Sequence, residues 1–265
     1  AVKDGKGNYV LNGEKWFSSA ARVADIAVIV AKTDENAPRR KRFSTFIVEL
    51  PNPGYRIVRD IETMAVQHPM YQYVGRSHSE VEIKDLVVPE EDLLGGEGNG
   101  FDMGQHRLAY GRLRHGMHNV AMAQRALDLA TAHVTKRETF GKKLSDRQGV
   151  QWMLADCASS LYMARLMLLH IAYKAEKGMD LRQENSMAKV YLAHMVHKVV
   201  DTAIQLHGAL GFSLDTPLAG WYTLIRSQRL VDGPDEVHNW TVGRNVIRAF
   251  ETFGTTAPAA GGELI

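Results

Sequence analysis

This sequence has little cysteine, no long hydrophobic run and no excess of one charge. Its single cysteine, Cys157, excludes an internal disulfide and a cysteine-rich metal site, and is typical of a reducing compartment. No apolar run reaches the roughly 18 residues that a transmembrane helix needs, so we expect no membrane span. The 32 basic and 30 acidic residues nearly cancel to a formal net charge of +2. We therefore expect neither a nucleic-acid partner nor a metal site.

The first part of the chain has the pattern of a β domain. Hydrophobic residues make up 45% of the 265 positions, enough for two domains or one large one. Short segments rich in Val, Ile, Phe and Tyr alternate with turn residues, which is typical of an antiparallel sandwich or barrel-like unit. The pair Asn12-Gly13, flanked by apolar residues, predicts a tight hairpin turn. We expect further strands over residues 25–31, 43–50, 55–58, 71–74 and 80–88.

The pattern changes to helices after the glycine-rich residues 95–100. This segment is superficially like a dinucleotide-binding loop, but it lacks the strand–turn–helix context, so we interpret it as a hinge. Asp180 and Gln183 predict a capping box at one helix start. The expected helices cover about 101–136, 146–177, 181–207, 216–229 and the segment after Asp232.

Long helices with short connections are typical of an antiparallel bundle. The sequence therefore predicts an α+β fold. An antiparallel β-sandwich or barrel-like domain over residues 1–94 precedes an antiparallel four-helix-type bundle over residues 95–254. We expect residues 255–265, which are mostly small and polar, to form a flexible tail.

A stiff turn precedes the last helix and carries Asp232. Gly233 gives conformational freedom, and Pro234 fits the first helical position. Asp235 and Glu236 fall in the first turn, where the helix macrodipole favours negative charge. Local pattern alone favours an ordinary turn and helix start over a carboxylate held for chemistry.

Four segments, in a fixed order along the chain, alter that balance. They are residues 12–18 (NGEKWFS), residues 137–144 (RETFGKKL) with Gln148, residues 205–212 (QLHGALGF) and the turn DGPDEVH at Asp232. Together they resemble the acyl-CoA dehydrogenase family, whose matching motifs are NGxKxWITN, RxxFG followed by Q, QxxGGxGF and YEGT.

The resemblance covers about residues 8–252, nearly the whole chain. It implies a middle β domain and a C-terminal four-helix domain. The family's N-terminal helical domain has no counterpart in these residues, so we expect the chain to be a piece of a longer protein.

The resemblance implies FAD as the cofactor. The residues that would line the flavin are Trp16, Phe17 and Ser18. An indole beside a hydroxyl offers the ring a flat apolar neighbour and a donor, although an aromatic packed in the sheet is the ordinary alternative.

The second and third motifs match positions that bind the rest of FAD in the family. Positions that contact FAD across a subunit interface are Arg137, Thr139, Phe140 and Gln148, which implies a homodimer or homotetramer. Gln205, Gly208 and Ala209 match contacts to the dinucleotide end, with Ala209 in place of the family's second glycine; Pro234 and Glu236 are also expected beside the cofactor. A solvated loop and a helix end are the ordinary alternatives.

Asp232 matches the place of the family's catalytic Glu. Some members carry the base at a second place instead, but that position is Gly111 here. Arg112 and Gly233 are expected beside the substrate. An Asp with this turn is similar to the larger multidomain members, and its arm is about 1.5 Å shorter than that of Glu.

The resemblance implies dehydrogenation of an acyl-CoA thioester. The α-proton would go to Asp232 and the β-hydride to flavin N5, with electrons passed to an electron-transferring flavoprotein. Two alternatives stay open: a nitroalkane oxidase or acyl-CoA oxidase on the same fold, and an inactive fragment that serves as a binding or assembly module. We expect a cytoplasmic location in a bacterium and the mitochondrial matrix in a eukaryote.

Overall fold

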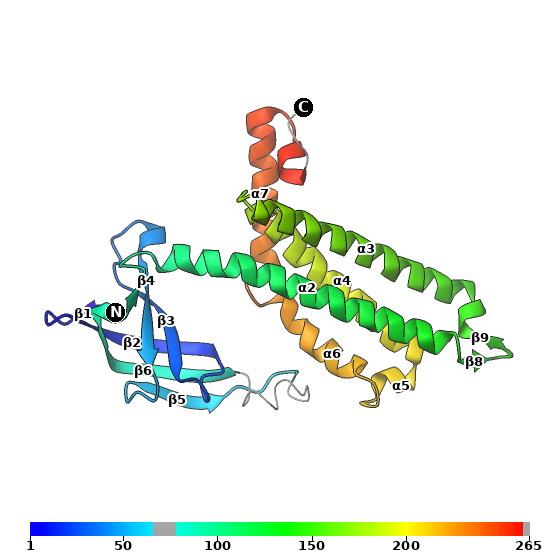
Figure 1. Ribbon diagram of the computed structural model, residues 1–265, viewed down its shortest axis with the longest axis horizontal. Helices are drawn as coiled ribbons and strands as arrows, with labels where there is room; N and C mark the ends of the chain where they lie inside the picture. Colours follow the sequence, from blue (N-terminus) through cyan, green and yellow to red (C-terminus); the bar gives the residue numbers. More distant parts are fainter. Residues whose placement is uncertain (66–77, 262–265) are drawn as a thin grey trace. The chain divides into compact units, whose positions relative to one another are not determined.

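The computed structural model describes residues 1–65 and 78–261 and divides into two compact units, Ala1–Arg107 and Leu108–Ile265 (Figure 1). Antiparallel sheets fill the first unit and helices dominate the second, which confirms the predicted α+β class. The strand predicted over residues 71–74 lies outside the described residues.

Two sheets form the first unit. One has the strand order β1 (Val2–Lys3), β2 (Asn8–Ser19), β6 (His78–Pro89) and β5 (Tyr55–Asp60); the other has the order β3 (Ile26–Lys32), β4 (Phe43–Glu49) and β7 (Leu93–Leu94). Two 3-10 turns, η1 (Arg39–Lys41) and η2 (Glu90–Asp92), lie between strands. Residues from both sheets share one buried core, so the sheets pack against each other. The largest of these residues are Tyr9, Leu11, Phe46, Val81, Leu86 and Val88.

The predicted hairpin turn at Asn12-Gly13 is wrong, because both residues lie inside the continuous strand β2. This strand pairs with β6, and the register shifts between Leu11 and Gly13. The Asn12 side chain accepts a hydrogen bond of 2.8 Å from the backbone N–H of Asp85. The Asn-Gly pair absorbs a β-bulge instead of reversing the chain, because β6 pairs with β2 on both sides of it.

The second unit is a bundle of long helices. Its principal elements are α2 (Gly100–Val134, which begins in the first unit), α3 (Gln148–Glu176), α4 (Arg182–His207), α5 (Ala209–Phe212), α6 (Leu218–Ile225), η4 (Arg226–Arg229) and α7 (Asp235–Phe253). A small hairpin of β8 (Glu138–Thr139) and β9 (Lys142–Lys143), followed by η3 (Leu144–Asp146), connects α2 to α3. Figure 1 shows α2, α3 and α4 running side by side.

Small residues on α2 allow this close packing. A Cβ at Gly116 would lie 2.7 Å from Leu168 of α3 and 2.8 Å from Leu192 of α4, so a larger residue would push the helices apart. The alanines Ala123, Ala126 and Ala130 continue the buried stripe of α2. These contacts hold α2 against the helices that carry the site.

The predicted capping box of Asp180 and Gln183 is wrong. Asp180 accepts a hydrogen bond from the backbone N–H of Arg182 at 3.0 Å, but the Gln183 side chain turns elsewhere. It donates to the carbonyl of Ala259 and accepts from Asn245, both at 2.7 Å. Gln183 therefore links α4 to α7 and to η5 (Ala257–Ala260), a 3-10 turn within the segment expected to be a flexible tail.

The described helices include none that is long and apolar enough to cross a membrane. Over residues 1–65 and 78–261, no group of three or more His, Cys, Asp or Glu side chains could hold a metal ion.

Candidate active site

The turn before α7 holds Asp232 in one conformation. Asp232 has a φ of 53° and Gly233 a φ of 102°, a region that L-residues rarely adopt. The Asp232 carbonyl accepts hydrogen bonds from Arg112 Nε at 3.0 Å and from His238 Nε2 at 3.2 Å. A Cβ at position 233 would lie 2.8 Å from His238 Nε2, so the turn requires glycine there. Pro234 occupies the N-cap of α7, one position before the expected one.

The buried Asp235 carboxylate anchors the start of α7 through contacts with three basic side chains. Its side chain is 5% exposed and contacts Arg229 Nε at 2.7 Å, His194 Nε2 at 2.9 Å and Lys189 Nζ at 3.2 Å. Burial alone would raise the pKa of the Asp235 carboxyl, but hydrogen bonds from Arg229, Lys189 and His194 outweigh it and hold the pKa below its ordinary value. Asp235 lies in the first turn of α7 as predicted, and its carboxylate also contacts basic side chains of α4 and η4.

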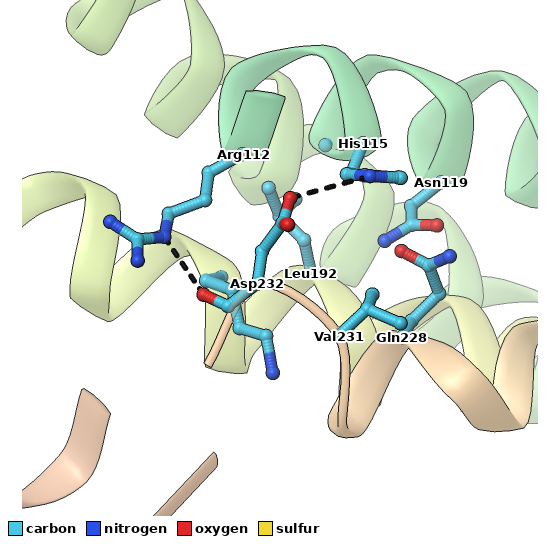
Figure 2. Close-up of a pocket in the computed structure, with 9 residues that line it drawn as sticks. Arg112, His115, Asn119, Leu192, Gln228, Val231 and Asp232 are labelled. Atoms are coloured by element: carbon cyan, nitrogen blue, oxygen red, sulfur yellow. Dashed lines mark hydrogen bonds and ion pairs between the residues drawn. The ribbon is translucent and has the colours of Figure 1, made fainter. Parts of the chain in front are cut away.

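The Asp232 carboxylate points toward α2, as Figure 2 shows. Its side chain is 14% exposed, and Oδ2 lies 3.4 Å from His115 Nε2. A Cβ at Gly111 would lie 3.4 Å from the same oxygen. A cavity of about 10 Å³, the space of roughly one water, adjoins the carboxylate. Its lining also includes Arg112, Gly116, Asn119, Lys189, Leu192, Gln228 and Val231.

Cationic side chains surround this carboxylate. Burial lowers the pKa of Arg112 and that of Lys189, and the charge of Asp232 opposes the shift in both. Burial also lowers the pKa of His238, whose Nε2–H donates to the Asp232 carbonyl. The site combines one carboxylate with several donors in a largely buried space, which suits proton transfer.

A second, larger cavity gathers the residues of two sequence motifs. It has a volume of about 540 Å³, and the predicted cofactor residues in its lining are Arg137, Thr139, Gln205, Gly208 and Ala209. This volume is within the usual range of ligand pockets. No atom lies within 4 Å of the place of a Cβ at Gly208, so the backbone there is open to a ligand.

Two histidines, His133 and His207, extend this lining. Their rings stack with centroids 4.4 Å apart. Burial lowers the pKa of His133, and the charges of His207 and Arg137 add to the shift. A forked guanidinium with neighbouring imidazoles and an open glycine backbone fits the pyrophosphate of a dinucleotide such as FAD.

Other predicted cofactor residues lie outside the lining of this cavity. Phe140 is 97% exposed, and Gln148 is exposed at the first residue of α3. Pro234 and the exposed Glu236 lie at the start of α7. The structure does not place these four side chains around one space.

The predicted flavin-lining residues lie on β2 of the first unit. Trp16 and Phe17 fall where the pairing of β2 with β6 shifts register, and each is at least half exposed. The Arg59 guanidinium lies 4.9 Å from the centroid of the Trp16 ring, and the Phe17 ring lies 5.0 Å from that of His78. A β-bulge of this kind redirects side chains, and here it presents two aromatics at the surface. Ser18 follows them and pairs with Ser79.

Sequence reasoning missed His115, Lys189 and Gln228 beside Asp232. His115 had a usable signal, because it lies three residues after Arg112 and four after Gly111 on one face of a helix. Lys189 and Gln228 had none, because α4 and η4 meet this turn through tertiary packing.

Comparison with known proteins places the chain in a family. Residues 98–247 match the model of the acyl-CoA dehydrogenase C-terminal domain, and residues 1–85 match that of the middle domain. Acyl-CoA dehydrogenase family member 11 from Gallus gallus is 38% identical over 247 residues, which cover 91% of this chain and 31% of the relative. The probable acyl-CoA dehydrogenase FadE2 from Mycobacterium tuberculosis is 35% identical, over 89% of this chain and 58% of the relative.

Solved structures show the same likeness. The structure of a putative acyl-CoA dehydrogenase from Mycobacterium abscessus has a TM-score of 0.86 at 33% identity, with 94% of this chain and 61% of that chain covered. This chain thus spans about a third to three fifths of the length of these relatives. The two domain matches and the fold agree, and the chain belongs to the acyl-CoA dehydrogenase family.

Proposed function

We propose that this chain forms the middle and C-terminal domains of an FAD-dependent acyl-CoA dehydrogenase in which Asp232 is the catalytic base. The observation that carries the proposal is the position of the Asp232 carboxylate. It is largely buried, fixed by a turn in the left-handed region, and aimed at α2 where Gly111 leaves room. Fixed geometry of this kind is what proton abstraction requires.

The side chains around Asp232 divide the work of the site. Arg112 and His238 hold the backbone of the turn through hydrogen bonds to the Asp232 carbonyl. Asp232 takes the α-proton of the acyl-CoA thioester. Gly233 lets the chain reverse beside the substrate without a side chain in the way.

FAD is the cofactor of the family, and the cavity at Arg137 is suited to its pyrophosphate. Arg137 would pair with the phosphates, while Gln205 and Gly208 would contact the dinucleotide end. We propose that Trp16, Phe17 and Ser18 face the flavin ring. When bound, FAD accepts the β-hydride, and an electron-transferring flavoprotein then takes the electrons. The contact of Arg137 with the FAD of a second subunit would require at least a dimer.

The Asp at position 232 also supports a second candidate, a nitroalkane or acyl-CoA oxidase on this fold. An oxidase would use the same carboxylate to remove a proton but would pass the electrons to oxygen. Peroxide formation distinguishes the two, because a dehydrogenase needs a separate electron acceptor.

The test is a titration of the intact, FAD-loaded protein with a series of acyl-CoA thioesters under anaerobic conditions. We expect the yellow flavin to bleach with at least one chain length and to regain colour with an electron-transferring flavoprotein. The proposal would be contradicted if dithionite bleaches the flavin and none of the acyl-CoA thioesters does. Bleaching followed by stoichiometric peroxide in air would favour the oxidase.

A further inference from the structure

His115 faces the Asp232 carboxylate, and the proposed reaction has so far given it no role. Its Nε2 lies 3.4 Å from Oδ2 of Asp232, and its side chain is 33% exposed (Figure 2). The contact joins α2 to the turn before α7 inside the helical unit. The contact therefore links α2 to the carboxylate that we propose as the catalytic base.

The fold directs Oδ2 toward this histidine. The Asp232 backbone is fixed by its φ of 53° and by the hydrogen bonds from Arg112 and His238 to its carbonyl. Gly111 and His115 lie one helical turn apart, so they share a face of α2. A Cβ at Gly111 would lie 3.4 Å from Oδ2. On α2, Gly111 therefore leaves open space beside Oδ2, and His115, one turn later, places an imidazole beside the same oxygen.

Three other titratable groups near the turn have hydrogen bonds or ion pairs to other atoms. Arg112 and His238 donate to the Asp232 carbonyl, and Lys189 Nζ lies 3.2 Å from Asp235 Oδ1. His115 lies beside the carboxylate itself. Histidine also changes charge near neutral pH, which an arginine does not. The imidazole can donate an N–H to the carboxylate in both its neutral and its protonated form.

We infer that His115 is a positioning residue for the base: it holds the Asp232 carboxylate in the orientation from which the carboxylate takes the substrate proton. The inference rests on the proposed function of Asp232. In the step, the α C–H bond breaks and the Asp232 carboxylate takes the proton. The electron pair forms the new C=C bond as the β-hydride leaves to FAD, and His115 keeps its proton count.

The first test measures the contact without catalysis. NMR titration of the imidazole signals is compared between the wild-type protein and Asp232→Asn, with the exposed His118 of the same helix as internal reference. We expect His115 to titrate at lower pH in D232N, because the carboxylate no longer stabilises its charged form, while His118 is unchanged. An identical His115 titration in both proteins would overturn the inference and leave the proposed function standing.

The second test measures turnover of the intact, FAD-loaded protein. We expect His115→Leu to lower kcat roughly tenfold with little change in KM, since a misplaced base slows the chemical step. His115→Gln, which retains an N–H donor, should keep most of kcat. His118→Leu is the matched control. A wild-type kcat in H115L would overturn the inference, and full activity of D232N would overturn it together with the proposed base.

Discussion

The Asp232 site and the Arg137 cavity lie in the same helical unit but are built differently. The space beside the Asp232 carboxylate is about 10 Å³, and the turn that carries it is fixed from α2 and α7. The cavity at Arg137 is about 540 Å³, with an open glycine backbone. Proton transfer requires exact placement of one group, whereas binding a large dinucleotide requires room and well-placed donors. The comparison indicates that changes at the first site should affect rate and stability, and changes at the second should affect cofactor affinity.

The largest effect on stability is expected from Asp235→Ala. This change leaves Lys189, His194 and Arg229 without their shared buried partner. Asp235 and Lys189 are both buried, and removal of one member of a buried ion pair costs about 3–5 kcal/mol of the free energy of unfolding. Denaturant unfolding measures it, with Glu236→Ala, an exposed carboxylate in the same turn, as control. Equal losses in the two variants would show that the contacts of Asp235 do not anchor α7.

Arg137→Gln should weaken FAD binding without affecting the Asp232 turn. Loss of a charge-assisted hydrogen bond of about 1.5–3 kcal/mol corresponds to roughly a tenfold to hundredfold higher Kd. Fluorescence titration of the apoprotein with FAD measures this change. The exposed Lys142→Gln of the neighbouring strand β9 serves as control. An unchanged FAD affinity in R137Q would separate this cavity from the cofactor.

Gly233→Ala should strain the turn by roughly 1–3 kcal/mol, because its backbone has a φ of 102° and the new Cβ would lie 2.8 Å from His238 Nε2. We expect a lower kcat and a lower unfolding midpoint with FAD affinity unchanged. Gly149→Ala, at a position with open space around it, is the control. A G233A protein with wild-type kcat would show that the turn tolerates rearrangement.

The smallest effect concerns pH. Burial lowers the pKa of His133, His197 and His238 from the ordinary 6.5, so the unfolded chain binds more protons than the folded one below about that pH. Stability should therefore decrease as the pH falls from 7 to 5. The Asp235 carboxyl, whose pKa is also lowered, adds a loss in more acidic solution, below its ordinary 3.8. Urea unfolding at each pH measures the trend, and a stability that rises on acidification would contradict it.

The success of prediction from the sequence differs between the elements of the fold. The change from strands to helices and the turn at Asp232 follow from local patterns, and the described residues have both. The Asn12-Gly13 hairpin failed because a distant strand, β6, supplied a partner that local pattern does not contain. Lys189 and Gln228 were missed for the same reason, since packing of α4 and η4 brings them to Asp232.

The residues predicted to bind FAD through the Arg137 cavity were only partly brought together by the structure. Arg137 and Gln205 were predicted as cofactor residues through the family resemblance, and the structure brings them to one cavity. Phe140 and Gln148 were predicted on the same basis, but they lie outside the cavity lining of this single chain. Motif matching identifies residues that contact one ligand in the family. It does not predict which of these residues line one cavity within a single chain.

The central claim is that Asp232 is the base, and the rate of anaerobic flavin reduction by an acyl-CoA tests it most directly. The comparison is between the wild-type protein and Asp232→Asn at equal FAD content, with the exposed Asp215→Asn as matched control. The account predicts reduction about a thousandfold slower in D232N, within the usual contribution of a general base, and an unchanged rate in D215N. Flavin reduction at the wild-type rate in D232N would contradict it.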